Sequence, residues 1–184
     1  MWSAGDVGGD PAATMEARYR AVGVESVYPD VSGGRSTVER LDGQTNAIDV
    51  AEAVRAGGYA GCWVIMIGTN DAANVAAGGV PDLDARIAAL LEVAGTMPVL
   101  WVNTVSRHTD PIWSDTQMQQ FNAALARATA AHPNLRVLDW ASRVRPEWLT
   151  SDGLHYTTEG PIWRAAITAA ELAVPARDVV DIHH

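Results

Sequence analysis

A short loop near the C-terminus carries the residues best suited to acid–base chemistry. Asp152 and His155 lie three positions apart, with Gly153 between them. This spacing lets the carboxylate hold one imidazole nitrogen while the other nitrogen faces a reacting group. The pair therefore indicates a general base and its orienting acid, as needed when a hydroxyl nucleophile attacks an acyl carbonyl.

Acyl transfer also needs uncharged donors that face the developing oxyanion. Asn70 offers a side-chain amide, and Gly33 or Gly34 offers a backbone N–H. We expect these groups to form an oxyanion hole. Capping of a following helix is the alternative role for Asn70, but its neighbour Asp71 is better suited to holding a loop through backbone N–H groups.

These loops require a scaffold, and the order of apolar and amphipathic segments predicts one. Apolar runs alternate with helix-like stretches, which is typical of βαβ units on a parallel sheet with helices on both faces. We predict five strands, at residues 2–4, 24–28, 61–67, 98–103 and 135–138. We predict helices at residues 11–22, 47–56, 83–94, 115–131 and 161–173. Loops after the carboxyl ends of such strands converge on a ligand crevice.

Length and composition predict one globular domain. The chain has 184 residues and is 48% apolar, so it can bury one substantial core. We assign residues 1–175 to the domain and residues 176–184 to a C-terminal tail that ends in the tag-like pair His183-His184. The single cysteine, Cys62, starts an apolar run, which predicts a buried thiol without a disulfide.

Charge and hydropathy exclude several kinds of partner. The formal net charge of −9, without a Lys/Arg cluster, argues against nucleic acid. No apolar stretch reaches the roughly 20 residues that span a bilayer, so we expect no direct membrane insertion. The chain shows no targeting signal.

In order along the chain, these blocks resemble the SGNH (GDSL-like) hydrolase and acyltransferase family. The resemblance covers essentially the whole chain and places Gly33 or Gly34 in the second block, Asn70 in the third, and Asp152 with His155 in the last. It implies a three-layer α/β/α, flavodoxin-like sandwich around a five-stranded parallel sheet. It further implies a Ser-His-Asp triad that needs no metal and no cofactor.

A narrower resemblance is to SGNH modules attached to membrane acyltransferases of the cell envelope. Residues 137–141, Trp113 and Asn122 carry it. It implies an extracytoplasmic domain whose parent protein contains a membrane acyltransferase domain. The implied substrate is a small-molecule or glycan ester, with a short acyl group such as acetyl on a sugar hydroxyl of a glycan or glycolipid.

The first block departs from the family pattern. The family reads Gly-Asp-Ser, with the Ser as nucleophile, whereas this chain reads Gly5, Asp6, Val7. Three alternatives stay open: a Ser that was deleted or replaced, a natural pseudoenzyme that binds glycan or lipid without turnover, or a modified Ser between Asp6 and Val7 that a standard-residue sequence omits. We favour the last, because the remaining catalytic positions are present.

Three further side chains are candidates for substrate contacts. Trp113 and Trp148 lie in or beside loops, where indole rings can stack on sugar rings. Arg35 follows the second block and either lines the pocket or is solvated. In contrast, Trp63 and Trp101 lie in apolar strands and are expected in the core.

Overall fold

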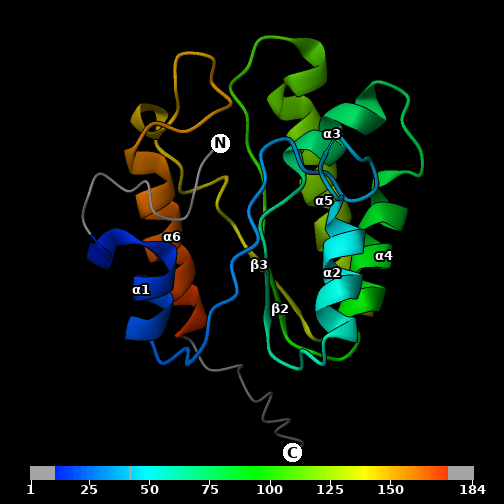
Figure 1. Cartoon of the computed structure of the whole chain (residues 1–184). Helices are drawn as coiled ribbons and strands as arrows, with labels where there is room; N and C mark the ends of the chain where they lie inside the picture. The colour runs from blue at the N-terminus through cyan, green and yellow to red at the C-terminus, as the bar shows by residue number, and fades with distance from the viewer. Residues whose placement is uncertain (1–10, 42, 174–184) are drawn as a thin grey trace, which may run out of the picture.

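A three-stranded parallel sheet forms the centre of the computed structural model, which describes residues 11–41 and 43–173 (Figure 1). The strands are β1 (Trp63–Ile65), β2 (Val99–Val102) and β3 (Leu135–Leu138), in that spatial order. All pairs are parallel, with Trp63 opposite Val99 and Val99 opposite Leu135. The carboxyl ends of the strands therefore meet at one edge of the sheet.

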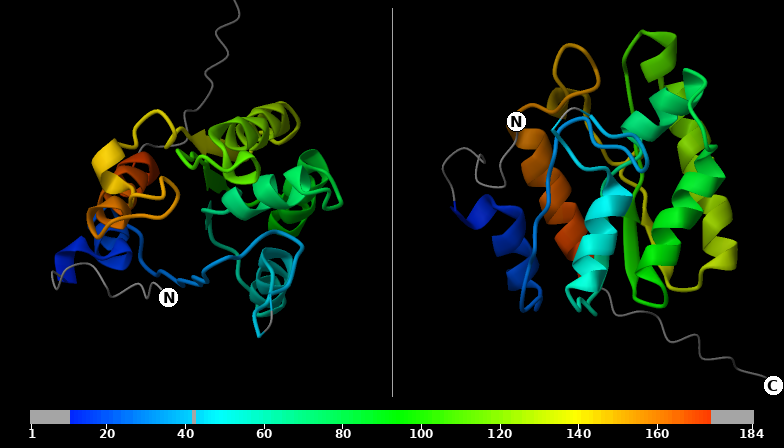
Figure 2. Two further views of the ribbon diagram at one scale, coloured as in Figure 1. Left: turned by 90° about the horizontal axis from the view of Figure 1, so that it is seen from above. Right: turned by 45° about the vertical axis from the view of Figure 1, so that its right-hand side comes forward.

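Helices lie on both sides of this sheet, as Figures 1 and 2 show. One side carries α1 (Met15–Ala21) and α6 (Glu159–Leu172), and the other carries α2 (Ala47–Ala56), α3 (Thr69–Ala76), α4 (Leu83–Ala94) and α5 (Asp115–Ala131). Short 3-10 turns occupy Pro11–Ala13, Pro111–Trp113 and Pro146–Trp148. The chain thus has the mixed α/β architecture that its alternating pattern predicts.

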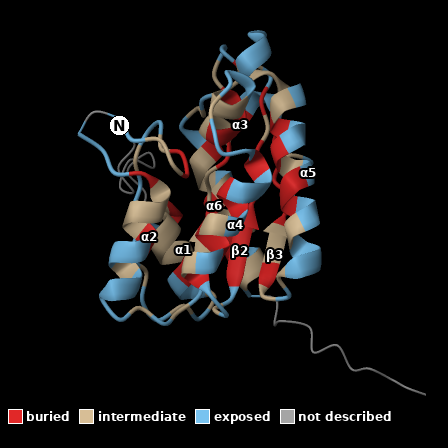
Figure 3. Cartoon of the chain, turned by 90° about the vertical axis from the view of Figure 1, so that its right-hand side faces the viewer, coloured by how far each residue is buried: buried red, intermediate tan, exposed pale blue. Residues whose placement is uncertain are grey.

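The two faces of the sheet contribute to two separate cores. Trp101 packs in a cluster with α4 and α5, whereas its neighbours Leu100 and Val102 pack in a second cluster with Trp140 and the α6 residue Ile167. Successive side chains of a strand point to opposite faces, so a strand between two helical layers must be apolar throughout. Figure 3 shows the resulting buried band through the middle of the molecule.

Helix α4 illustrates why the helical segments were predictable. Asp82 caps its N-terminus by accepting a hydrogen bond from the Ala85 N–H, at 2.9 Å. Leu83, Ile87 and Leu90 then recur at spacings of three and four residues and are buried. The predicted bounds of residues 47–56, 83–94 and 115–131 coincide with those of α2, α4 and α5.

The prediction of five strands is wrong for the described residues, which contain three. Residues 24–28 form no ladder there, because no described strand lies beside them to accept their backbone bonds. The predicted strand at residues 2–4 lies outside the described residues. The prediction for Cys62 is also wrong: β1 begins one residue later, and the thiol is exposed.

Within residues 11–41 and 43–173, no helix combines the length and the apolar character required to cross a bilayer.

Candidate active site

The Asp152–His155 loop forms the pair that its spacing predicts. Oδ2 of Asp152 lies 2.7 Å from Nδ1 of His155, and Oδ1 accepts hydrogen bonds from the N–H groups of Leu154 and His155 at 2.8 and 3.0 Å. The Thr150 hydroxyl donates to the same Oδ1 at 2.7 Å. The His155 side chain is 76% exposed. Since Nδ1 is held, Nε2 is the nitrogen left for a substrate or nucleophile.

The hydrogen bonds to Asp152 determine its charge. The contact with His155 is the strongest influence, and with the Leu154 amide and the Thr150 hydroxyl it holds the pKa of Asp152 well below its usual range. The carboxylate therefore stays ionised across the range in which most enzymes work. An ionised carboxylate on Nδ1 fixes the imidazole orientation and stabilises its protonated form.

Glycine is required inside this loop. Gly153 has a φ of +72°, and a Cβ there would lie 2.7 Å from the backbone of Arg107. The Arg107 N–H donates to the Gly153 carbonyl at 2.7 Å. The loop is thus fastened to the segment that follows β2, at the carboxyl edge of the sheet.

Trp148 does not provide a sugar-stacking surface, contrary to our expectation. It is 4% exposed and stacks between Trp140 and Trp163, with ring centroids 5.7 and 5.5 Å away. The indole belongs to the core beneath the His155 loop, whose Thr157 N–H donates to the Trp148 carbonyl at 3.0 Å. Trp163 is the exposed member of this stack and was not among the residues predicted to contact substrate. Trp113 is half-buried in its 3-10 turn.

Asn70 lies in the first turn of α3, immediately after β1. Its side-chain amide donates to the carbonyl oxygen of Arg35 at 3.1 Å. The structure therefore places Asn70 beside the loop that contains Gly33 and Gly34, both exposed. The sharp turn into α3 depends on Gly68, whose φ is +143° and where a Cβ would overlap the Phe121 ring.

Arg35 lines a cavity rather than lying free in solvent. Its side chain is 12% exposed and forms an ion pair with Asp30. This cavity, of about 410 Å³, runs beside β1 and is bordered mainly by apolar side chains such as Val54 and Leu90. Arg164 of α6 also lines it, with the guanidinium 4.8 Å from the Tyr156 ring centroid.

A second, smaller cavity links the two halves of the candidate site. It measures about 40 Å³ and lies over the carboxyl ends of β1 and β2. Thr69, next to Asn70, lines one side, and Leu154 and Tyr156, on either side of His155, line another. The structure thus brings the neighbours of the predicted base and of the predicted oxyanion donor to one crevice.

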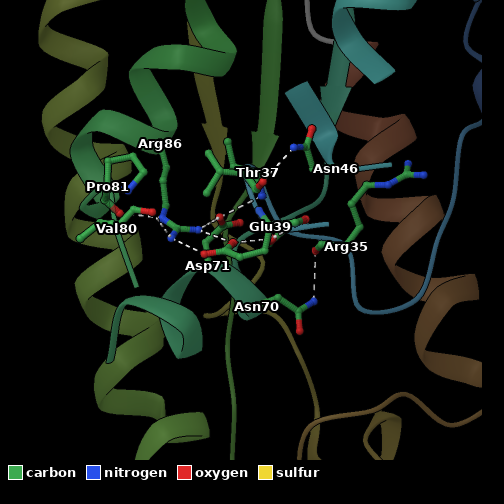
Figure 4. A network of polar contacts seen from close by, with 11 residues as sticks. Arg35, Thr37, Glu39, Asn46, Asn70, Asp71, Val80, Pro81 and Arg86 are labelled. Atoms are coloured by element: carbon green, nitrogen blue, oxygen red, sulfur yellow. Dashed lines mark hydrogen bonds and ion pairs between the residues drawn. The ribbon is translucent and has the colours of Figure 1, made fainter. Parts of the chain in front are cut away.

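Asp71 holds the loop after the two glycines, as its predicted structural role requires (Figure 4). Its Oδ1 accepts from the Thr37 N–H at 2.9 Å and from Arg86 at 3.0 Å, and the side chains of Asp71 and Arg86 are 0% exposed. Burial raises the pKa of Asp71, and these two hydrogen bonds act in the opposite direction. Arg86 also binds Glu39 through both carboxylate oxygens, at 2.5 and 2.6 Å.

Arg86 and Glu39 were missed by the sequence analysis. The available signal was a cation on the apolar face of α4, one residue before the buried Ile87. Such a cation requires a partner when it is buried. The sequence alone did not identify that partner, because Glu39 is 47 positions away.

Glu39 makes stability depend on pH. Burial acts to raise its pKa, but hydrogen bonds from Arg86 and Ser36 prevail and lower it to about 2. An unfolded Glu titrates near pH 4.3, so the stabilisation is complete above about pH 5 and is lost as the pH falls toward 2. In urea unfolding, the difference in free energy between the unmodified chain and Glu39→Gln should shrink over this interval. A difference independent of pH would contradict this reading.

The first block, which was expected to supply the nucleophile, comprises Gly5, Asp6 and Val7. These three residues lie outside the described residues. Among the residues that the structure describes, no group of three or more His, Cys, Asp or Glu side chains is arranged to hold a metal ion.

The fold has a counterpart among solved structures. No protein-family model matches the chain. No curated protein matches it either. The chain is similar to the crystal structure of the lipase/acylhydrolase from Enterococcus faecalis, with a TM-score of 0.50 and 23% sequence identity. The match covers 60% of this chain and 60% of the other. A likeness at this identity establishes the fold.

Proposed function

We propose that this chain is a serine esterase or O-acyltransferase of the SGNH type, acting on short acyl esters such as acetyl esters. A Ser of the first block attacks the acyl carbonyl, and His155 takes its proton while Asp152 orients His155. As the ester C–O bond breaks, His155 returns this proton to the leaving alcohol, and the acceptor then takes the acyl group from the Ser. Asn70 and a backbone N–H of Gly33 or Gly34 stabilise the oxyanion. The acceptor is water or a sugar hydroxyl of a cell-envelope glycan or glycolipid, in an extracytoplasmic parent protein that also carries a membrane acyltransferase domain.

The single observation that carries this proposal is the Asp152–His155 contact of 2.7 Å in a loop at the sheet edge where Asn70 also lies. A carboxylate held by three further donors is an orienting group with a fixed charge. Such a dyad beside an amide donor serves acyl transfer without a metal. The fold shared with a lipase/acylhydrolase supports the same class of reaction by analogy.

The presence of a nucleophilic Ser decides whether the chain can hydrolyse esters. Intact-mass analysis with peptide mapping across residues 5–11 should reveal one modified seryl residue more than the sequence predicts. Protein in which this Ser carries a free hydroxyl should hydrolyse p-nitrophenyl acetate and react with a Ser-directed fluorophosphonate. If the mass matches the sequence, inserting Ser between Asp6 and Val7 should create turnover, and an inactive insertion variant would overturn the proposal.

One observation favours a second candidate, a catalytically silent glycan- or lipid-binding module: the sequence passes from Asp6 to Val7 without a Ser. This candidate predicts a mass that matches the sequence, no fluorophosphonate labelling, and no turnover in the insertion variant. Ester turnover by the chain that carries the Ser, whether natural or inserted, therefore separates the two functions.

A further inference from the structure

We propose that Arg86 and Glu39 are positioning residues for the oxyanion donors: with Asp71, they fix residues 35–37 against Asn70. This inference rests on the proposed function, since it concerns the same donors. Neither side chain faces the crevice through a contact of its own. Their effect is transmitted by the backbone of the loop that follows Gly33 and Gly34.

The network joins three segments that are distant in sequence, as Figure 4 shows. Arg86 on α4 donates from Nε to the Pro81 carbonyl at 2.8 Å, which anchors the guanidinium to the turn before its own helix. Its other nitrogens reach Asp71 on α3 and Glu39 after the loop. A planar guanidinium with several fixed donors suits this role, because its nitrogens together hold Pro81, Asp71 and Glu39.

The loop is then held at two successive points. The backbone carbonyl of Arg35 accepts a hydrogen bond from the Asn70 side-chain amide. The Thr37 N–H donates a hydrogen bond to the Asp71 carboxylate. Asn70 and Asp71 are adjacent in α3, so the loop lies alongside the first turn of this helix. The distance between the Asn70 amide and the N–H groups of Gly33 and Gly34 therefore depends on how firmly Asp71 is held.

Charge balance explains why Glu39 is needed as well as Asp71. Arg86 is fully buried, and a buried guanidinium requires close anionic partners. Glu39 binds it through both oxygens and also accepts the Ser36 hydroxyl at 2.6 Å, within the same loop. Loss of the Glu39 charge leaves Asp71 as the sole carboxylate on Arg86 among the described residues. We expect Arg86 to shift toward Asp71, which would displace the Thr37 N–H and the loop.

The test compares the Glu39→Gln variant of the full chain with the wild-type chain, and ester hydrolysis is its first readout. Misplacement of about 1 Å at a catalytic group costs on the order of 10²-fold in rate. We expect kcat for p-nitrophenyl acetate to fall about 10- to 100-fold with KM nearly unchanged, because oxyanion contacts strengthen only in the transition state. Arg86→Lys, which keeps the charge and loses the fork, should behave similarly.

Asp84→Asn is the matched control. Asp84 lies on the same helix α4 and pairs with Arg127, but both side chains are largely exposed and neither contacts the loop. This variant should leave kcat unchanged. Assays run well below each unfolding midpoint separate positioning from stability, since a merely structural role lowers the midpoint and leaves kcat of the folded protein intact. Unchanged kcat in both Glu39→Gln and Arg86→Lys would overturn the proposal.

A readout without turnover separates this inference from the proposed function. In NMR spectra, Glu39→Gln should shift the Asn70 side-chain amide resonances and speed hydrogen exchange at the Thr37 amide, and Asp84→Asn should do neither. If the wild-type chain has no esterase activity, the proposed function fails, and these spectra decide the positioning role. Asn70 and Thr37 signals of Glu39→Gln that match those of the wild-type chain would then refute the positioning role.

Discussion

Replacement of His155 by Ala is expected to lower kcat/KM for p-nitrophenyl acetate by at least about 10²- to 10⁴-fold, the contribution that a positioned general base typically makes. The reason is that Nε2 of His155 is the proton acceptor that the geometry supplies, and Asp152 already occupies Nδ1. The imidazole is exposed, so its loss should hardly affect folding. Initial rates and circular dichroism spectra of the two proteins measure both effects.

His132→Ala provides the control for this result. His132 follows the C-terminus of α5 and makes its backbone hydrogen bond to Ala128, remote in sequence from the Asp152 loop. Its replacement should leave kcat/KM within about twofold, as expected for a substitution away from the site. Equal rates for His155→Ala and the unmodified chain would show that another group acts as base.

Arg86→Met is expected to produce the largest loss of stability, about 3–5 kcal/mol in the free energy of unfolding. The substitution keeps an unbranched chain of similar length but leaves the fully buried Asp71 without its guanidinium partner. It also removes the donor to the Pro81 carbonyl. Urea unfolding followed by tryptophan fluorescence and circular dichroism gives the difference.

Arg127→Met is the comparison for this experiment. Its ion pair with Asp84 is exposed on both sides and screened by solvent, so the loss of stability should be far smaller than that of Arg86→Met. Adding Asp71→Asn to Arg86→Met should restore part of the stability, because a neutral amide is cheaper to bury unpaired than a carboxylate. A loss no larger than that of Arg127→Met would mean that the Asp71–Arg86 pair is replaceable by solvent or by local rearrangement.

Local patterns explain what was predictable about the site. Asp152 and His155 are close in the chain, so their contact of 2.7 Å depends on one loop and its glycine. The turn after β1 likewise places Asn70 directly at the sheet edge. These features need only short-range geometry, which the residue types and their spacing specify.

Long-range packing explains what was not predictable. Trp148 lies beside a turn, and only the stack with Trp140 and Trp163 shows that it is buried. The partners of Arg86 come from segments 15 and 47 positions away. No periodicity in the sequence encodes such pairs, because they arise where separate helices and loops meet.

The sequence by itself determined the alternation of helices and strands, the cap and apolar face of α4, and the pairing of Asp152 with His155, since each depends on neighbours within a few residues. Tertiary structure alone decided that residues 24–28 lie outside the ladder and that Glu39 reaches Arg86. A strand needs a neighbouring strand for its backbone bonds, and a buried cation needs a carboxylate brought to it by the fold.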